Sequence, residues 1–348
     1  MTQDIEVCGG DYEHTLGFGT PHEATPRLRY TITALGELSR RVLSGDAFDV
    51  AEYSLANYIM LKDRGDDRLT AIPVFPSRAF RNASVFVPVG SALHDLRDLA
   101  GCRVGVSDFA MTTAVWTRGH LSDDVGLDCK SIDWVTGGNP RFAAPGGVRA
   151  TATTDDLETL LLDGKIDALM AGRPRDQQLP PDQRRLRFLA PDTEAIERRY
   201  FSTTGLFPIM HTVVLHARIA GDPQTSQRVF EHYVQTKQTA LKRRLSTSLL
   251  PFSDRAWDHF SSPGGPDPYQ HGLTELNRRN ITTLSRYLLE QGFIVTHRHN
   301  ILEQMDRVLV MVDGKLSLYG TRDQVALALS QKNSGAGVHP IRGNEVFA

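Results

Sequence analysis

Cysteine is scarce in this sequence, and no cysteine is placed for a disulfide or a metal. The three, Cys8, Cys102 and Cys129, are odd in number and widely spaced, and no CxxC motif occurs. This pattern excludes a disulfide framework and gives no indication of a structural zinc site. We therefore expect the thiols to stay reduced.

Long apolar runs and a strong net charge are missing as well. No apolar run approaches the roughly 18 residues that a membrane helix needs. The N-terminal stretch MTQDIEVCGGDYEHT has neither the basic nor the apolar region of a secretory signal. The net charge of -2 provides no basic field, and the basic clusters at 184–187 and 242–244 lack interleaved aromatic residues. We expect a cytoplasmic protein that binds neither nucleic acid nor membranes.

What the sequence does contain is a repeated alternation of short apolar runs and helical segments. The first ~90 residues read β-α-β-α-β, and a second such series follows between 102 and 170. With 348 residues there is room for two domains. We predict an α/β fold of two lobes, with lobe one at 1–88 and 212–292 and lobe two at 89–211. Two hinge crossings would join the lobes, and a ligand would bind in the cleft between them.

The stretch AIPVFPSRAFRNASVFV at 71–87 is central to this organisation. A buried strand ends at Pro76, a loop presents Ser77, Arg78 and Arg81, and the chain re-enters a strand. An arginine at the end of a strand suits bidentate binding of a carboxylate or phosphate. The alternative is a surface loop with two solvated arginines. In the whole chain, Arg78 is predicted to face the cleft, and bracing of the hinge is the alternative role for Arg81.

Other polar candidates lie where predicted strands meet helices or glycine turns. Such junctions face the ligand crevice in α/β folds. Each has a structural alternative: a plain turn for Asp11, a solvated side chain for Arg118, and a satisfied core histidine for His211. The further candidates at these junctions are Glu52, Ser54, Thr112, Thr113, Gly137 and His271.

Five strings carry a resemblance to a known family. They are GDAFDVAEYSLANYI, AIPVFPSRAFRNASVFV, VGVSDFAMTTAVWTRGHL with WVTGG, LFPIMHTVV, and DPYQHGL before a helix. Together they resemble the 4,5-dihydroxyphthalate decarboxylases in the same order, over about 10–292, with 17–26 matching least well. The resemblance implies a type 2 periplasmic-binding-protein-like fold in a cytoplasmic enzyme. It also implies conversion of 4,5-dihydroxyphthalate, a small aromatic dicarboxylate, to protocatechuate, with no organic cofactor. We also expect a homo-oligomer.

This reaction needs a group that holds the dianion and a group that protonates the ring. Arg78 and Arg81 suit the carboxylates, with Arg118 in reserve. His211 can supply the ring proton, because imidazole titrates near working pH. Glu52 or Asp11 would orient that histidine or take the phenolic proton. The remaining candidates are a second acid, His271, and the binding residues Ser54, Ser77, Thr112, Thr113 and Gly137.

Two alternatives stay open at this point. A divalent ion could chelate the catechol oxygens with His211 and Glu52 or Asp11 as its ligands, although the spacing indicates no metal site. The chain could also be a cytoplasmic solute-binding module, or a biosynthetic enzyme of the same fold that binds an aromatic carboxylate.

The last part of the chain has a different character. Residues 294–329, which include Thr296, His297 and Arg298, resemble the end of an ABC-transporter ATPase. No P-loop GxxxxGK[ST] occurs anywhere, so this segment cannot hydrolyse ATP by itself. We predict an appended β-hairpin and helix at 293–329 and disorder at 330–348, which is rich in Gly, Ser and Asn.

Overall fold

The chain divides into two units, and the first of them contains both large sheets. The computed structural model describes residues 4–19, 27–45, 48–246, 251, 267, 269–295, 307–312 and 315–321. The first unit consists of Met1–Ile59 and Asp67–Phe293, and the second of Met60–Asp66 and Ile294–Ala348. In the part of the chain that is described, no helix is long and apolar enough to cross a membrane.

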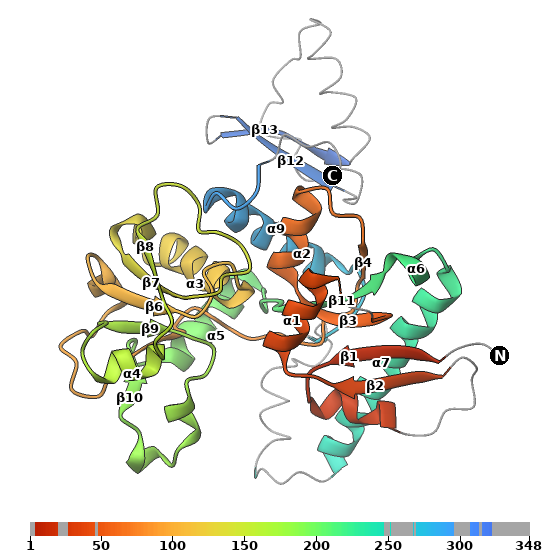
Figure 1. The fold of residues 1–348 in the computed structure, drawn as a ribbon, viewed down its shortest axis with the longest axis horizontal. Coiled ribbons are helices and arrows are strands. Elements are labelled where there is room, and N and C mark those ends of the chain that lie inside the picture. The colour runs from red at the N-terminus through yellow and green to blue at the C-terminus, as the bar shows by residue number, and fades with distance from the viewer. Residues whose placement is uncertain are drawn as a thin grey trace, which may run out of the picture. The chain divides into compact units, whose positions relative to one another are not determined.

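The first sheet has five strands in the order β2-β1-β3-β11-β4 (Figure 1). β1 runs parallel to β2 and β3, whereas β11 runs antiparallel to β3 and β4. We call this sheet and its helices the first lobe. Its elements are β1 (Ile5–Gly9), η1 (Glu13–Gly19), β2 (Leu28–Ile32), α1 (Leu35–Ser44), β3 (Val50–Ser54), α2 (Leu55–Asp63), β4 (Leu69–Ile72), β11 (His211–His216), α6 (Ala217–Ala220) and α7 (Pro223–Ser246).

One face of the first sheet is apolar and is covered by η1 and α7. Side chains alternate between the two faces of a strand, so every second residue of β1, β3 and β11 points to this face. The core that results contains Ile5, Val7, Val50, Val213 and Leu215 from the strands, Phe18 from η1, and Val229 and Tyr233 from α7.

The second sheet has six strands in the order β10-β5-β9-β6-β7-β8. Parallel pairing joins β9, β6, β7 and β8, and β5 pairs antiparallel to β9 and β10. We call this sheet and its helices the second lobe. Its elements are β5 (Val85–Pro88), η2 (Leu96–Leu99), β6 (Arg103–Val106), α3 (Thr112–Asp123), η3 (Cys129–Ser131), β7 (Asp133–Gly137), β8 (Ala150–Thr153), α4 (Leu157–Leu162), β9 (Ala168–Met170), η4 (Arg175–Gln178), η5 (Pro181–Gln183), β10 (Leu186–Phe188) and α5 (Thr193–Thr204).

These two sheets with their helices confirm the predicted two-lobed α/β fold, with one correction at the boundary. We expected residues up to 88 to belong to the first lobe, but β5 lies in the second sheet. The chain therefore leaves the first lobe after β4, and the loop at 73–84 makes the crossing. The return crossing ends where β11 begins at His211, close to the predicted boundary.

Helix α9 (Glu275–Glu290) packs against α3. The Trp116 and Tyr287 rings meet edge to face, with centroids 5.4 Å apart. Gly119 makes this approach feasible, because a Cβ on it would lie 2.3 Å from ring carbons of Tyr287. A side chain at this position would therefore separate the two helices.

The described part of the second unit includes an antiparallel hairpin of β12 (Arg307–Val312) and β13 (Lys315–Thr321). This confirms the predicted hairpin. Three other predictions for the end of the chain lie outside the described residues. They concern the motif at 296–298, the helix after the hairpin, and disorder at 330–348.

Candidate active site

A glutamate and a histidine meet at one edge of the first sheet. His211 is paired with Ser54 across β11 and β3, and Glu52 lies two residues before Ser54 on the same face. Glu52 and His211 are thus diagonal neighbours, and Glu52 Oε1 lies 2.6 Å from His211 Nδ1. The carboxyl ends of β1 and β3 and the start of β11 share this edge, which is where α/β sheets bind ligands.

The Glu52 carboxylate is 2% exposed and accepts hydrogen bonds at both oxygens. The Gly10 N–H donates to Oε2 at 2.8 Å, and the Tyr12 hydroxyl donates to Oε1 at 2.7 Å. Burial by itself would raise the pKa of Glu52, but the hydrogen bonds and the charge of His211 outweigh it and lower that pKa. Glu52 is therefore an ionised carboxylate at neutral pH.

The His211 ring is held through one nitrogen. An ionised carboxylate only accepts hydrogen bonds, so we assign the proton on Nδ1 to the bond with Glu52. The side chain is 20% exposed, and Nε2 is left to face a ligand. A buried carboxylate behind an imidazole fixes the tautomer and the orientation of the ring. The pair can thus hold a proton at Nε2 and donate it.

The glycines after β1 allow the backbone to close over Glu52. A Cβ on Gly9 would lie 2.4 Å from the Tyr30 hydroxyl and 3.3 Å from Glu52 Oε2. The Tyr30 hydroxyl donates to the Gly10 carbonyl at 2.7 Å, which fixes the turn. Neither Tyr12 nor Tyr30 was predicted as a site residue. The signal for Tyr12 is its place directly after the glycine turn at a strand's carboxyl end.

Ser77, a predicted substrate-binding residue, lies at this edge. Its carbonyl accepts the N–H groups of Met210 at 2.9 Å and His211 at 3.3 Å, so the crossing loop supports the start of β11. Burial raises the pKa of Tyr12, the nearby Glu52 adds to this rise, and a hydrogen bond with the Ser77 side chain partly offsets it. Tyr12 therefore keeps its proton.

Ser54 and Thr112 are close together, but their hydroxyls are engaged within the protein. Their oxygens are 2.8 Å apart, and both side chains are buried. Ser54 Oγ accepts the N–H of Asn57, and Thr112 Oγ1 accepts that of Ala56, so both cap the start of α2. The half-buried Thr113 contacts Met210 Sδ at 3.7 Å. These residues join α2 to α3, and one of the two hydroxyl hydrogens of Ser54 and Thr112 is used in the bond between them.

Arg78 is a correction to both sequence-based alternatives. It is 6% exposed, so it is neither solvated nor open to a ligand. Its guanidinium donates to the carbonyls of Phe207 and Gln270 and, at 2.6 Å, to Asn277 Oδ1. Burial lowers its pKa to about 10, which still leaves it charged at neutral pH. Arg78 ties the crossing loop to the start of α9.

Arg118 was the reserve carboxylate ligand, and the structure places it in an aromatic core. It is 2% exposed, with its guanidinium carbon 3.7 Å from the centroid of the Phe109 ring. It donates to Gln291 Oε1 and to the Phe109 carbonyl. Burial lowers its pKa to about 9. This position excludes substrate contact in the structure as described.

Three other candidates, Asp11, Gly137 and Arg81, make no contact with Glu52 or His211 among the described hydrogen bonds and ion pairs. Asp11 is exposed, and within the described residues it makes no hydrogen bond or ion pair. Gly137 allows two backbones to approach, because a Cβ on it would lie 2.4 Å from the Ser107 carbonyl oxygen. Arg81 is half-buried and reaches the Gly172 carbonyl at 3.5 Å, in accord with its alternative role as a hinge brace.

His271 does not suit the role of second acid. Its Nδ1 accepts the Phe75 N–H at 3.2 Å. Burial, assisted by the charges of Lys237 and Arg78, lowers its pKa to about 3. The ring is therefore neutral at neutral pH and has no spare proton to donate as an imidazolium.

The metal alternative requires side chains that are placed to bind a cation together. Within the described residues, no group of three or more His, Cys, Asp or Glu side chains is placed to hold a metal ion. Glu52 and His211 bond to each other, and the hydrogen bonds on both Glu52 oxygens would have to be displaced by a cation. The residues present do not form a ready cation site.

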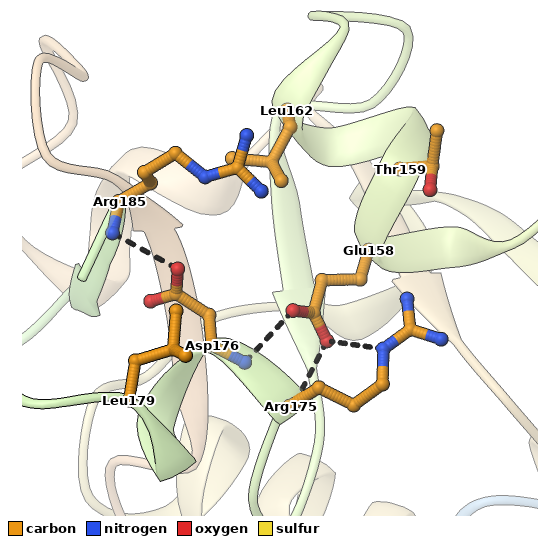
Figure 2. Close-up of a pocket in the computed structure, with 7 residues that line it drawn as sticks. All are labelled: Glu158, Thr159, Leu162, Arg175, Asp176, Leu179 and Arg185. Atoms are coloured by element: carbon orange, nitrogen blue, oxygen red, sulfur yellow. Dashed lines mark hydrogen bonds and ion pairs between the residues drawn. The ribbon is translucent and has the colours of Figure 1, made fainter. Parts of the chain in front are cut away.

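Two cavities lie in the second lobe, away from this chemistry. One of about 240 Å³ is shown in Figure 2, where the Glu158 carboxylate accepts the backbone N–H groups of Arg175 and Asp176. The other, of about 550 Å³, is lined by residues around Ser91 and Asp167. Neither contains a predicted site residue, and neither brings an acid–base pair together. We therefore place the site at Glu52 and His211.

Solved structures similar to this chain share its fold. The alkanesulfonate-binding protein SsuA from Xanthomonas axonopodis pv. citri matches with a TM-score of 0.51 and 15% identity, over 85% of this chain and 95% of that one. A Candida albicans protein with the generic periplasmic binding protein fold matches with a TM-score of 0.53 and 12% identity, over 86% and 94%. The fold is thus periplasmic-binding-protein-like, as predicted.

Sequence relatives identify the family. No family model matches the chain. A 4,5-dihydroxyphthalate decarboxylase from Comamonas testosteroni is 30% identical over 262 residues, which is 69% of this chain and 76% of that protein. Another from Pseudomonas putida is 32% identical over 136 residues, 36% of this chain and 53% of that protein. The chain therefore belongs to the 4,5-dihydroxyphthalate decarboxylase family.

Proposed function

We propose that this protein decarboxylates a hydroxylated aromatic dicarboxylate without an organic cofactor, and that the reaction is 4,5-dihydroxyphthalate to protocatechuate. The observation that supports it most is the hydrogen bond between the buried Glu52 and the partly exposed His211, at the edge of the sheet where α/β folds bind ligands. A binding protein needs no such pair, whereas a reaction that protonates carbon does. Membership of the decarboxylase family supports the substrate.

In the proposed reaction, the bond between a ring carbon and its carboxylate breaks, and its electron pair stays on the ring carbon. That carbon takes a proton from His211 Nε2, and carbon dioxide leaves. A phenolate para to the departing carboxylate pushes electron density into the ring. Glu52 holds the His211 ring through Nδ1 and fixes its orientation for the transfer. Solvent then returns the proton to His211.

The test is carbon dioxide release by purified protein with 4,5-dihydroxyphthalate, with protocatechuate identified as the product. His211→Asn keeps a donor toward Glu52 but removes Nε2, so we expect turnover to fall roughly 10²- to 10⁴-fold. Substrate affinity should change little. His216→Asn is the matched control, since His216 lies at the other end of β11 and accepts the Arg218 N–H, which an asparagine can also do.

Tight binding of the substrate without turnover, both with and without added divalent metal, would favour a solute-binding module. Turnover only with added metal would bring back the metal alternative. Independence from organic cofactors is part of the proposal and is tested by the same assay. The cytoplasmic location, the homo-oligomer and the absence of a nucleic-acid partner stay predictions.

A further inference from the structure

Two donors share one oxygen of Glu52. The Tyr12 hydroxyl lies 2.7 Å from Oε1, and His211 Nδ1 lies 2.6 Å from the same atom. The other oxygen, Oε2, accepts the Gly10 N–H. Tyr12 is thus the one side chain besides His211 that the described residues place on this carboxylate. The proposed reaction gives it no role.

Tyr12 is held in position from several sides. Its ring stacks on His14, with centroids 5.1 Å apart and planes within 5°. Its backbone N–H donates to Thr15 Oγ1, and its carbonyl accepts the Thr15 N–H. The phenol therefore meets Glu52 through a fixed frame and not through a freely rotating side chain.

We propose that Tyr12 is a positioning residue that fixes where the proton of the Glu52–His211 pair resides. This inference rests on the proposed function, because it concerns the proton that His211 donates. The phenol donates to Oε1, and a hydrogen bond donated to a carboxylate favours its ionised form, so Glu52 is kept as an acceptor. His211 must then turn its Nδ1–H, and not a lone pair, toward Oε1. The exchangeable proton is thereby confined to Nε2, the atom that faces the ligand.

Tyr12→Phe tests this, because it removes only the hydroxyl and keeps the ring that stacks on His14. We expect kcat to fall roughly 10- to 100-fold through misplacement of the proton donor, with KM changed less than about threefold. In a plot of kcat against pH, the acid limb, where activity falls as the pH is lowered, should move to higher pH. The reason is that the Tyr12 hydrogen bond is one of the interactions that lower the pKa of Glu52.

Tyr30→Phe is the matched control. It also removes a tyrosine hydroxyl from the same turn, but that hydroxyl donates to the Gly10 carbonyl and not to Glu52. The acid limb should stay in place in this variant. Equal shifts of the acid limb in both variants would show a general loosening of the turn and overturn the proposal.

A second measurement is independent of turnover. Nitrogen NMR of the His211 ring in the full-length protein should show the Nδ1–H form in the wild type and a larger share of Nε2–H in Tyr12→Phe. If the wild type turns over no substrate but the NMR change occurs, the proposed function fails and the positioning role stands. Identical ring signals in both proteins would refute the role.

If Tyr12→Phe fails to fold, a fluorinated tyrosine at position 12 replaces it as the test. Its more acidic phenol donates a stronger hydrogen bond, so the acid limb should move to lower pH. An unchanged acid limb would again overturn the proposal.

Discussion

The guanidinium of Arg78 is buried, and its hydrogen bonds go to acceptors from two segments distant in sequence. Phe207 lies on the return crossing, whereas Gln270 lies in the loop before α9 and Asn277 in the first turn of that helix. Arginine presents several donors in a planar fork, and lysine cannot reproduce that geometry. The Arg78 guanidinium therefore stabilises the fold by joining the two crossings between the lobes. A substrate carboxylate would have to displace its hydrogen bonds to reach it.

Arg78→Lys should therefore destabilise the fold by about 1–3 kcal/mol through lost charge-assisted hydrogen bonds. The measurement is urea unfolding at pH 7, with KM for the substrate measured in parallel and expected to change less than about twofold. Arg97→Lys is the control, because Arg97 is an exposed partner of Asp95, and its free energy of unfolding should change by less than about 0.5 kcal/mol. A raised KM with unchanged stability would restore Arg78 as a substrate ligand.

His271 carries a pH dependence of stability. Its pKa is lowered from 6.5 to about 3 in the folded chain, so the unfolded chain binds this proton first as the pH falls. Folding stability is therefore complete above about pH 6.5 and is lost toward pH 3. One such group reduces the free energy of unfolding by at most about 1.4 kcal/mol per pH unit in this window.

His271→Asn should make the free energy of unfolding less dependent on pH between 6.5 and 4. Asparagine keeps an acceptor near the position of Nδ1 for the Phe75 N–H, but it does not titrate. Unfolding curves at several pH values for both proteins give the comparison. A slope in the variant equal to that of the wild type would assign the acid sensitivity to other groups.

The sequence made Glu52, Ser77 and His211 candidates because strand ends and junctions are visible in local patterns. It could not show that Arg78 donates to Asn277 or that the hydroxyls of Ser54 and Thr112 bond to each other. These partners lie 199 and 58 residues apart in the sequence. Tyr12 was missed for the same reason, since its partner Glu52 is 40 residues distant.

Among the secondary-structure elements, helices with a strong hydrophobic periodicity could be predicted close to their observed bounds. The sequence patterns of 36–43 and 227–245 each predict a helix, and the structure has α1 at Leu35–Ser44 and α7 at Pro223–Ser246. Helix α5 was missed, although Asp192 caps its start and Gly205, with a φ of 66°, ends it. Its many charged and β-branched residues obscure the hydrophobic period that is typical of a helix.

The sheet to which β5 belongs could not be predicted from the local sequence, because the strands that pair with β5 are distant along the chain.

The packing of α3 on α9 depends on one glycine. A Cβ on Gly119 would meet the Tyr287 ring at 2.3 Å, and that ring is 2% exposed with its hydroxyl bonded to Asp123. Because the ring has no free direction in which to move, Gly119→Ala should destabilise the protein by about 1–3 kcal/mol through overpacking. Thermal and urea unfolding would measure the loss.

Gly36→Ala is the matched control in another helix. A Cβ on Gly36 would have nothing within 4 Å, and alanine has the higher helix propensity. We expect this variant to be as stable as the wild type or slightly more stable. If both variants behave alike, the contact between α3 and α9 is looser than the structure indicates.

At the scale of the whole molecule, the last boundary between the two units along the chain falls between Phe293 and Ile294. Phe293 is 6% exposed, and its ring centroid lies 5.7 Å from the guanidinium carbon of Arg118 and 5.9 Å from the centroid of Phe109. It therefore completes the aromatic core around Arg118. The candidate site and both large sheets lie within the first unit, so the remainder of the second unit is not needed to form them.

A chain ending after Val295 should keep the turnover and the unfolding temperature of the full protein. A chain ending after Gly292 lacks Phe293 and exposes the Arg118 core, so we expect it to be less stable by about 3 kcal/mol, as for loss of a buried aromatic ring. The two shortened chains differ by Phe293, Ile294 and Val295, so their comparison separates the contribution of these three residues from that of the ATPase-like segment. Loss of activity already in the chain ending after Val295 would show that the segment supports the decarboxylase, for instance through an oligomer contact, and size-exclusion chromatography of both chains would identify that case.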